Sequence, residues 1–249
     1  MRFLVAIPVY NEAPYIGGVI PRVQEHADDI LVVDDGSTDG TGEALSRYSV
    51  AVRRHETNRG YGAALRTAFE YAGDEGFDWV LTMDCDGQHE PESIPCFRER
   101  AMRGGVDVIS GTRYARESGD DAPNDRRAIN ATITAEINER LGGLLGGGIS
   151  DAFCGFKAHR VTALTGMRFE ENGYAFPMRF WVQAAALRLR VTEMPVERIY
   201  HDYNRTFGGG LDDPATRLEH YRHAFHCELA RCAARLPESA TVDSESRCR

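Results

Sequence analysis

Up to about residue 110 the chain alternates short apolar runs with segments of helical periodicity, and this alternation limits the folds open to it. The apolar runs, each a predicted strand, are residues 3–9, 30–33, 50–53, 79–83 and 106–110. Helical patterns separate them at 13–26, 41–48, 60–72 and 91–103. Strands that alternate with helices form a mostly parallel sheet covered on both faces. We therefore expect an α/β fold with a mostly parallel sheet flanked by helices.

The second half of the sequence extends the same domain. Its predicted elements are a helix at 126–145, a strand and turn at 151–160, a helix at 174–187, a strand at 189–199, a glycine-containing loop at 200–211 and a helix at 214–235. A chain of 249 residues suits one large α/β domain better than two small ones. We place this single domain at residues 1–236 and expect 237–249 to be a disordered tail.

Composition and charge limit the cell compartment and the binding partners that we expect for this chain. The net charge of −9 disfavours nonspecific binding to nucleic acid or to anionic lipid headgroups. The six cysteines form no C-x-x-C pair, which argues against a zinc ribbon, and reduced thiols are the default expectation. The first twelve residues favour a strand over a signal peptide. No apolar stretch approaches the 18 residues of a membrane span, so we expect a cytoplasmic protein that meets a lipid partner peripherally, at the cytoplasmic face of the membrane.

The helix at 126–145 bears on that membrane contact, because it carries a stripe of isoleucine and leucine residues. We favour a core-facing amphipathic helix. The alternative is an interfacial helix that lies in the bilayer surface, although the basic face typical of such helices is missing.

Polar clusters follow four of the predicted strands at the point where each strand ends. These clusters are residues 10–12, 34–35, 84–86 and 112–113. The carboxyl ends of parallel strands meet at one edge of a sheet, and ligands of such folds bind beyond that edge. The four clusters therefore predict a single site.

Asp84 and Asp86, separated only by Cys85, form the sharpest of these clusters. Two carboxylates just beyond a buried strand can converge on one divalent cation. Mg²⁺ and Mn²⁺ prefer oxygen ligands and share their coordination with substrate phosphates. Gln88 and His89 are close enough in sequence to add a ligand. Taken alone, a D-x-D pattern is weak evidence for a metal site and favours a solvated turn.

Two further segments have a ligand-binding and a purely structural interpretation. Asp34 and Asp35 could accept hydrogen bonds from a base or ribose, or they could form an Asx turn and helix cap. Asn58 and Gly60 precede a helix, where glycine allows the backbone to approach a ligand closely or simply makes a turn.

Arginines flank an acidic segment later in the chain. Arg113, Arg126 and Arg127 have the fork of donors that suits phosphate recognition. The alternative is that they are solvated or paired with the nearby Asp120, Asp121 and Asp125. For Arg113, which directly follows a predicted strand, we favour a functional role.

Considered together, these motifs resemble glycosyltransferase family 2, of GT-A fold, and most of all its dolichyl- or polyprenyl-phosphate mannose synthase branch. The matching motifs are PVYNE at 8–12, DDGSTD at 34–39, NRG at 58–60, DCDGQ at 84–88 and GTRY at 111–114. SDAFCGFK at 150–157 looks like the "sDxxsGFr" segment of that branch, and GYAF at 173–176 and EMPV at 193–196 also have counterparts. The resemblance spans roughly residues 2–211 and implies a GT-A type, Rossmann-like sheet.

The resemblance also implies roles for individual residues. The nucleotide sugar is bound by Pro8, Tyr10, Glu12, Asp34, Asp35, Asn58, Gly60, Asp84, Cys85 and Asp86. Asp86 binds the metal with Asp84 beside it, and Gln88 assists. Arg113 and one of Arg126 or Arg127 grip the acceptor phosphate, while Asp151 lies near the donor sugar. The implied catalytic residues are therefore Asp84, Asp86, Arg113 and Asp151.

The sequence departs from the family pattern at two places. Tyr61 stands where the family often has lysine, and the segment at 201–208 lacks the usual arrangement of Arg, Ser and Lys. Arg205 could replace that lysine at a shifted position.

The implied reaction is inverting transfer of a hexosyl unit from a nucleotide sugar, of GDP-mannose or UDP-glucose type, to a polyprenyl or dolichyl phosphate, with Mg²⁺ or Mn²⁺. A phosphate monoester acceptor is already ionised near neutral pH and needs no base. A sugar hydroxyl, the acceptor in the alternative of cell-envelope polysaccharide or glycolipid synthesis, requires a carboxylate base, for which Asp151 is the candidate. A non-catalytic nucleotide-sugar binding module is a further alternative, which the intact Asp84 and Asp86 argue against.

Overall fold

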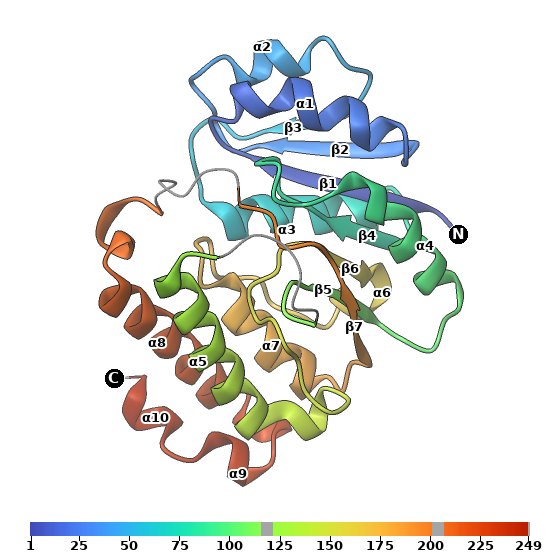
Figure 1. Cartoon of the computed structure of the whole chain (residues 1–249). Helices are drawn as coiled ribbons and strands as arrows, with labels where there is room; N and C mark the ends of the chain where they lie inside the picture. Colours follow the sequence, from blue (N-terminus) through green and yellow to red (C-terminus); the bar gives the residue numbers. More distant parts are fainter. Residues whose placement is uncertain (116–121, 201–206, 249) are drawn as a thin grey trace.

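The computed structural model describes residues 1–115, 122–200 and 207–248 (Figure 1). Its strands are β1 (Phe3–Val9), β2 (Asp29–Asp34), β3 (Ala51–Arg54), β4 (Trp79–Thr82), β5 (Val108–Thr112), β6 (Lys157–Arg160) and β7 (Val191–Pro195). Its α-helices are α1 (Ala13–Gln24), α2 (Thr41–Leu45), α3 (Tyr61–Asp74), α4 (Ile94–Met102), α5 (Asn124–Leu141), α6 (Val161–Leu164), α7 (Phe176–Ala186), α8 (Pro214–Arg231), α9 (Glu238–Thr241) and α10 (Ser244–Arg247). Each predicted strand and helix up to residue 235 is present, with boundaries that shift by a few residues.

The strands form one sheet in the order β3-β2-β1-β4-β6-β5-β7. All neighbours in it are parallel except β6, which runs antiparallel to both β4 and β5. The prediction of a mostly parallel sheet is thus confirmed. Because β6 is reversed, its first residue, Lys157, pairs with Thr82 and Ser110 near the ends of β4 and β5. The segment that precedes β6 therefore lies at the same edge as the segments that follow β4 and β5.

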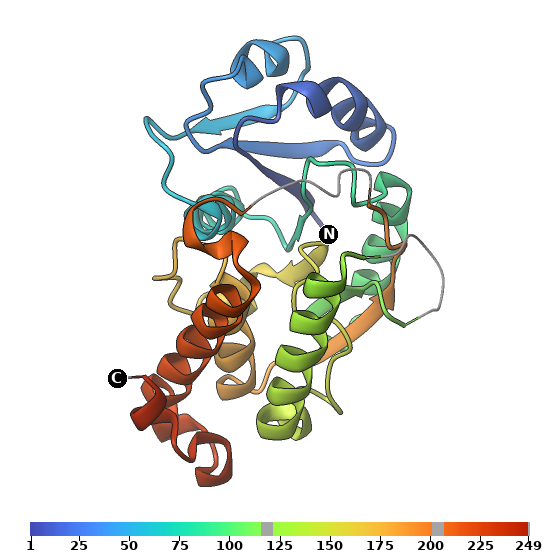
Figure 2. The same cartoon turned by 60° about the vertical axis from the view of Figure 1, so that its left-hand side comes forward.

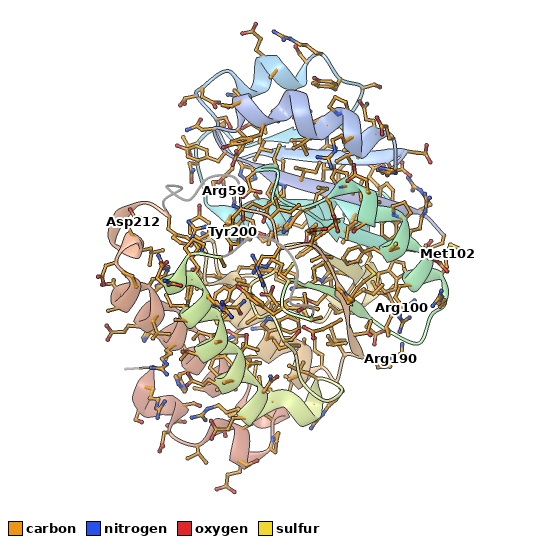
Figure 3. All side chains as sticks on the ribbon, in the orientation of Figure 1. Arg59, Arg100, Met102, Arg190, Tyr200 and Asp212 are labelled. Carbon is orange, nitrogen blue, oxygen red and sulfur yellow. A yellow bond between two sulfur atoms is a disulfide. The ribbon has the colours of Figure 1, made fainter. Side chains whose placement is uncertain are left out.

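Two apolar layers cover the sheet, one on each face. Side chains alternate between the faces along a strand, so in β1 the residues Val5 and Ile7 join the cluster with α1 and α4. Leu4 and Ala6 join the opposite cluster, which contains residues of α3, α5, α7 and α8. Side chains fill the space between these helices and the sheet (Figure 3). The sheet is consequently buried on both faces, as a parallel sheet requires.

Helices α5 and α8 run side by side in both views of the fold (Figures 1 and 2). On α5 the residues Ile129, Ile133, Ile137 and Leu141 are buried in the core. The core-facing interpretation of this helix is confirmed. No helix in the described part of the chain is long and apolar enough to cross a membrane.

The C-terminal segment differs from the expected disordered tail, because residues 238–247 form α9 and α10. Ala240 is fully buried, and Arg140 of α5 donates hydrogen bonds to the carbonyls of Ala240 and Val242. A disulfide joins Cys227 of α8 to Cys248, which differs from the default expectation of reduced thiols. The packing and the covalent link together hold this segment against α5 and α8.

Candidate active site

A cavity of about 470 Å³ opens at the carboxyl edge of the sheet. Twelve of the predicted site residues line it: Pro8, Tyr10, Glu12, Asp35, Asn58, Gly60, Asp84, Cys85, Asp86, Gln88, Arg113 and Arg126. Among the described residues predicted for the site, Asp34, Arg127 and Asp151 do not line it. Arg205 falls outside the described residues. Clusters that are distant in sequence thus meet in one place, as the strand-end argument predicts.

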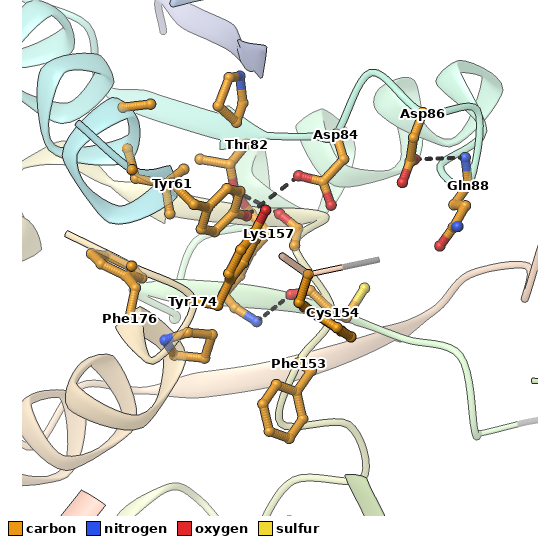
Figure 4. Close-up of a pocket in the computed structure, with 18 of the residues that line it drawn as sticks. Tyr61, Thr82, Asp84, Asp86, Gln88, Phe153, Cys154, Lys157, Tyr174 and Phe176 are labelled. Carbon is orange, nitrogen blue, oxygen red and sulfur yellow. Dashed lines mark hydrogen bonds between the residues drawn. The ribbon is translucent and has the colours of Figure 1, made fainter. Parts of the chain in front are cut away.

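Asp84 and Asp86 occupy the loop that follows β4. The backbone N–H of Asp84 donates to Nδ1 of His89 at 2.9 Å, which closes this loop on itself. Asp86 Oδ1 accepts from the backbone N–H of Gln88 at 3.0 Å. Figure 4 shows Asp84, Asp86 and Gln88 following one another along one side of the cavity. Carboxylate and amide oxygens are therefore presented from alternate positions, 84, 86 and 88, of one loop.

These oxygens fit a divalent cation that is bound together with a substrate. In the described part of the chain, no group of three or more His, Cys, Asp or Glu side chains could hold a metal ion. Asp84, Asp86 and the Gln88 amide would leave the remaining coordination positions to ligand oxygens and water. Mg²⁺ is usually held in this way, by one or two carboxylates together with substrate phosphates.

Asp34 and Asp35 have different positions, although they are neighbours. In extended backbone adjacent side chains point to opposite sides. Asp35 faces the cavity, and its carboxylate accepts hydrogen bonds from the backbone N–H groups of Arg59 and Gly60, at 2.9 and 2.7 Å. Asp34 is fully buried and accepts from the Ser37 N–H at 2.8 Å. The structure thus differs from the expectation that both acids reach the nucleotide: Asp34 caps a turn, as the alternative interpretation predicts.

Tyr61, the first residue of α3, was not among the predicted site residues. Its hydroxyl donates to Asp84 Oδ1 at 3.3 Å, and its ring stacks on Tyr174 with centroids 6.0 Å apart. Burial and the nearby charge of Asp84 raise the pKa of the Tyr61 hydroxyl well above its usual value. The departure from lysine at this position was the only sequence signal that pointed to it.

Arg113 and Asp151 form a buried ion pair. Nε and Nη2 of Arg113 donate to Oδ2 and Oδ1 of Asp151 at 2.7 and 3.0 Å. Oδ1 also accepts from the Asn130 amide at 2.9 Å and from the Phe153 N–H at 3.1 Å. Burial alone would raise the pKa of Asp151, but the charge of Arg113 and these hydrogen bonds lower it to about 2.

This environment argues against the general-base role that the sequence offers Asp151 in the case of a sugar-hydroxyl acceptor. The carboxylate is fully buried, does not line the cavity, and is engaged by the guanidinium of Arg113, the Asn130 amide and backbone N–H groups. A carboxylate with a pKa of about 2 is a weak proton acceptor. The arrangement suits Asp151 to orient Arg113, whose guanidinium reaches the cavity.

The two adjacent arginines of α5 differ in their position relative to the cavity. Arg126 lines the cavity, and its guanidinium lies 5.0 Å from the ring centroid of Phe207. Arg127 is exposed and does not line the cavity. Of the two arginines left open by the sequence, only Arg126 lines the cavity.

Helix α8 adds cavity residues that the sequence did not predict. The Arg217 guanidinium lies 4.5 Å from the Phe207 ring, donates to the Leu211 carbonyl and pairs with Asp125. Tyr221 lies one helical turn later, packs against Phe153 and also lines the cavity. Arg217 and Tyr221 share an i, i+4 face, but Asp125 and Phe153, against which they pack, are about 70 to 90 residues earlier in the chain, so no local pattern places them at the cavity.

Lys157 connects the segment before β6 to the sheet. Its Nζ donates to Ser110 Oγ at 2.9 Å and to the Cys154 carbonyl at 2.8 Å, and it lies 4.7 Å from the Trp181 ring centroid. Burial lowers the pKa of this ammonium from its usual value. The contact with the Cys154 carbonyl (Figure 4) fixes the segment in which Gly155 lies beside Asp84.

Comparison with known proteins agrees with this geometry. The family model for glycosyl transferase family 2 matches residues 4–166, which is well over half of the chain. The chain belongs to this family. The matched region runs from β1 to α6, so α7, β7 and α8 lie outside it.

Two curated relatives of this family 2 glycosyltransferase cover most of its length. One is an undecaprenyl-phosphate mannosyltransferase of Micrococcus luteus, 30% identical over 222 residues, with 85% of this chain and 89% of the relative covered. The other is a polyprenol monophosphomannose synthase of Mycolicibacterium smegmatis, 32% identical over 207 residues, with 78% and 76% covered.

A solved structure supports the fold. Glucosyl-3-phosphoglycerate synthase from Mycobacterium tuberculosis, in complex with Mn²⁺, UDP and glucosyl-3-phosphoglycerate, aligns with a TM-score of 0.70 at 20% identity. The alignment covers 96% of this chain and 81% of that one. The glycosyltransferase has the GT-A fold expected from its motifs.

Proposed function

We propose that this glycosyltransferase transfers a hexosyl unit, with inversion, from a nucleotide sugar to a polyprenyl phosphate. The observation that carries the proposal is the charge arrangement of one cavity: Asp84 and Asp86 lie on its wall, and so do Arg113, Arg126 and Arg217. Carboxylates suit a cation-bound diphosphate, whereas guanidinium groups suit an anionic acceptor. The names of the two curated relatives, both of which act on polyprenyl-type acceptors, support the same acceptor class.

The nucleotide end of the cavity would be formed by residues after β1 and β2 and before α3. Pro8, Tyr10, Glu12, Asp35, Asn58 and Gly60 would line it. A divalent cation, Mg²⁺ or Mn²⁺, would be held by Asp84, Asp86 and Gln88 and would stabilise the charge that develops on the departing nucleoside diphosphate. Asp34 and Arg127 take no direct part in this scheme.

The acceptor end would be formed by Arg113, Arg126 and Arg217. Asp151 holds Arg113 in place through hydrogen bonds and is itself held by the Asn130 amide, so the orientation of Arg113 does not have to be created when the acceptor arrives. An ionised phosphate oxygen is already nucleophilic, because the second pKa of a phosphate monoester is about 6. The attack therefore needs no general base, in agreement with the engaged state of Asp151. One direct displacement at the anomeric carbon inverts its configuration.

A labelled-donor screen tests the proposal. GDP- and UDP-sugars are incubated with polyprenyl phosphate or with a sugar-hydroxyl acceptor, in Mn²⁺ or in EDTA. We expect transfer to the phosphate that depends on the divalent cation, together with a product of inverted anomeric configuration. Transfer only to the hydroxyl acceptor would favour the alternative of polysaccharide or glycolipid synthesis, and metal-dependent binding without turnover would favour a non-catalytic module.

The same proposal places the protein at a membrane surface during turnover, because a polyprenyl phosphate resides in the bilayer. Flotation with liposomes that contain or lack the acceptor lipid measures this directly. Association that requires the acceptor lipid is expected, given the acidic net charge of the chain.

A further inference from the structure

The carboxylate of Asp84 contacts two other parts of the fold besides its own loop. Oδ1 accepts the hydrogen bond from the Tyr61 hydroxyl at 3.3 Å, and Oδ2 lies 3.9 Å from Nε2 of His89. On a third side the backbone of Gly155 is so near that a Cβ there would lie 2.8 Å from Oδ2 and 3.0 Å from the Tyr61 hydroxyl. The orientation of this carboxylate is therefore determined by α3 and by the segment before β6 as well as by its own loop.

Tyr61 is itself held firmly at the start of α3. The preceding residue, Gly60, has a φ of +100° and donates its N–H to Asp35. The following residue, Gly62, donates to the Asn172 carbonyl at 2.8 Å, and a Cβ at Gly62 would lie 2.1 Å from the Glu171 carbonyl oxygen. With its ring stacked on Tyr174 as well, Tyr61 has little freedom to move away from Asp84.

A phenol beside an ionised carboxylate donates a hydrogen bond and adds no charge of its own. It can therefore fix the carboxylate without competing electrostatically with a cation, as an ammonium group at the same place would. A carboxylate that is already oriented loses less rotamer freedom when it takes part in binding.

We infer that Tyr61 is a positioning residue, which orients the Asp84 carboxylate for the cation-bound diphosphate of the donor. The inference rests on the proposed function, because it assigns Asp84 to the cation and diphosphate end of the cavity. Tyr61 acts through Asp84 and needs no contact with the reacting atoms.

The test is Tyr61→Phe, which keeps the ring and its stacking on Tyr174 and removes only the hydroxyl. Titration calorimetry measures the affinity for GDP and UDP with and without Mn²⁺, so the readout does not depend on turnover. We expect the affinity in Mn²⁺ to fall about tenfold, a typical effect of one hydrogen bond to a charged group, and the affinity in EDTA to stay unchanged. The Mn²⁺ concentration for half-maximal transfer should rise by a similar factor.

Tyr71→Phe is the matched control, since it removes the same hydroxyl from the same helix. Tyr71 packs on Phe77 and lies under Arg53, away from the cavity, so its variant should bind as the wild type does.

Two results overturn the inference alone: an unchanged affinity of Tyr61→Phe in Mn²⁺, or an equal loss in EDTA, which would mean that Tyr61 contacts the nucleotide directly. Absence of Mn²⁺-dependent nucleotide binding in the wild type would instead overturn the proposed function, and the inference with it.

Discussion

The guanidinium of Arg113 and the carboxylate of Asp151 face each other through two hydrogen bonds, from Nε to Oδ2 at 2.7 Å and from Nη2 to Oδ1 at 3.0 Å. Both groups are largely or fully buried, with side-chain exposures of 14% and 0%. Removing one partner of such a pair leaves the other charge without compensation in a poorly solvated place. The pair therefore couples the cavity wall at Arg113, the proposed acceptor end, to the core beneath it.

Asp151→Asn should impair transfer mainly through Arg113. We expect kcat/KM for the acceptor to fall by about 100-fold, and the free energy of unfolding to fall by about 3 kcal/mol, because the Arg113 charge loses its counter-ion. The affinity for the nucleoside diphosphate in Mn²⁺, measured by calorimetry, should change little.

The pH dependence of kcat/KM in the wild type also tests whether Asp151 positions Arg113 or acts as a base. Since the pKa of Asp151 is about 2, its carboxylate stays ionised at all pH values above about 4 and contributes no acid limb there. An acid limb between pH 5 and 7 that disappears in Asp151→Asn would contradict the positioning role and restore Asp151 as a base.

The two neighbouring arginines of α5 provide a matched pair of variants. Arg126→Ala should raise the KM for a polyprenyl phosphate by tenfold or more, roughly the effect of one charge-assisted contact to phosphate. Arg127→Ala should behave as the wild type, because Arg127 is exposed and lies outside the cavity. Steady-state kinetics with the acceptor varied at saturating donor measures both. An equal change of KM in the two variants would contradict the proposal that Arg126 binds the acceptor phosphate.

Gly155→Ala should damage the donor end without unfolding the protein. Its Cβ would lie 2.8 Å from Asp84 Oδ2, closer than a nonbonded contact allows, so the carboxylate must turn away. We expect a KM for the nucleotide sugar about tenfold higher or more, by the loss of an oriented charged contact. Gly143→Ala is the control, since a Cβ there meets nothing within 4 Å. Wild-type donor kinetics in Gly155→Ala would show that the Asp84 orientation is unimportant.

Glu136 of α5 should make stability depend on acid. The hydrogen bond from His226 is the largest cause that lowers the pKa of Glu136, to about 2, and Arg222 adds to it against the opposing effect of burial. A carboxyl whose pKa is lower in the folded state stabilises the protein above its unfolded pKa of about 4.5. That contribution is lost as the pH falls from about 5 toward 2. With allowance for solvent screening, Glu136→Gln should lose about 1–2 kcal/mol at pH 7.

Urea unfolding of this variant at pH 7 and pH 3 measures the loss. Its difference from the wild type should shrink at the lower pH. Glu139→Gln, an exposed change on the same helix, should stay within about 0.5 kcal/mol of the wild type at both values. A difference for Glu136→Gln that grows toward pH 3 would contradict the sign of this prediction.

The sequence predicts the strand-end acids well, because a strand that stops just before Asp84 or Asp35 must deliver these residues to the carboxyl edge of a parallel sheet. It predicts less well which of two adjacent acids faces the cavity. Asp34 and Asp35 were assigned together, yet the last residue of β2 turns its carboxylate into the 35–37 turn. A shift of one residue in strand register would exchange which of the two acids faces the cavity, and amino-acid composition does not determine that register.

The residues that the sequence missed depend on contacts between distant segments. Arg217 and Tyr221 reach the cavity only because α8 packs beside α5, and neither follows a predicted strand. The ordered C-terminal segment was missed for a similar reason. Cys227 and Cys248 are 21 residues apart with no recognisable spacing motif, and the docking of Ala240 depends on Arg140, 100 residues earlier in the chain.

The reversed direction of β6 also bears on the order in which the molecule assembles. Strands β1, β2 and β3 pair across only about 20 to 25 residues, so this part of the sheet can form early, whereas β4 pairs with β1 across 76 residues. The pairing of residues 79–82 with residues 157–160 must close a loop of nearly eighty residues, and distant closures of this kind form slowly. We therefore expect Gly155 to arrive beside Asp84 after strands β1 to β3 have paired, so that the enzyme becomes competent for catalysis late in its maturation.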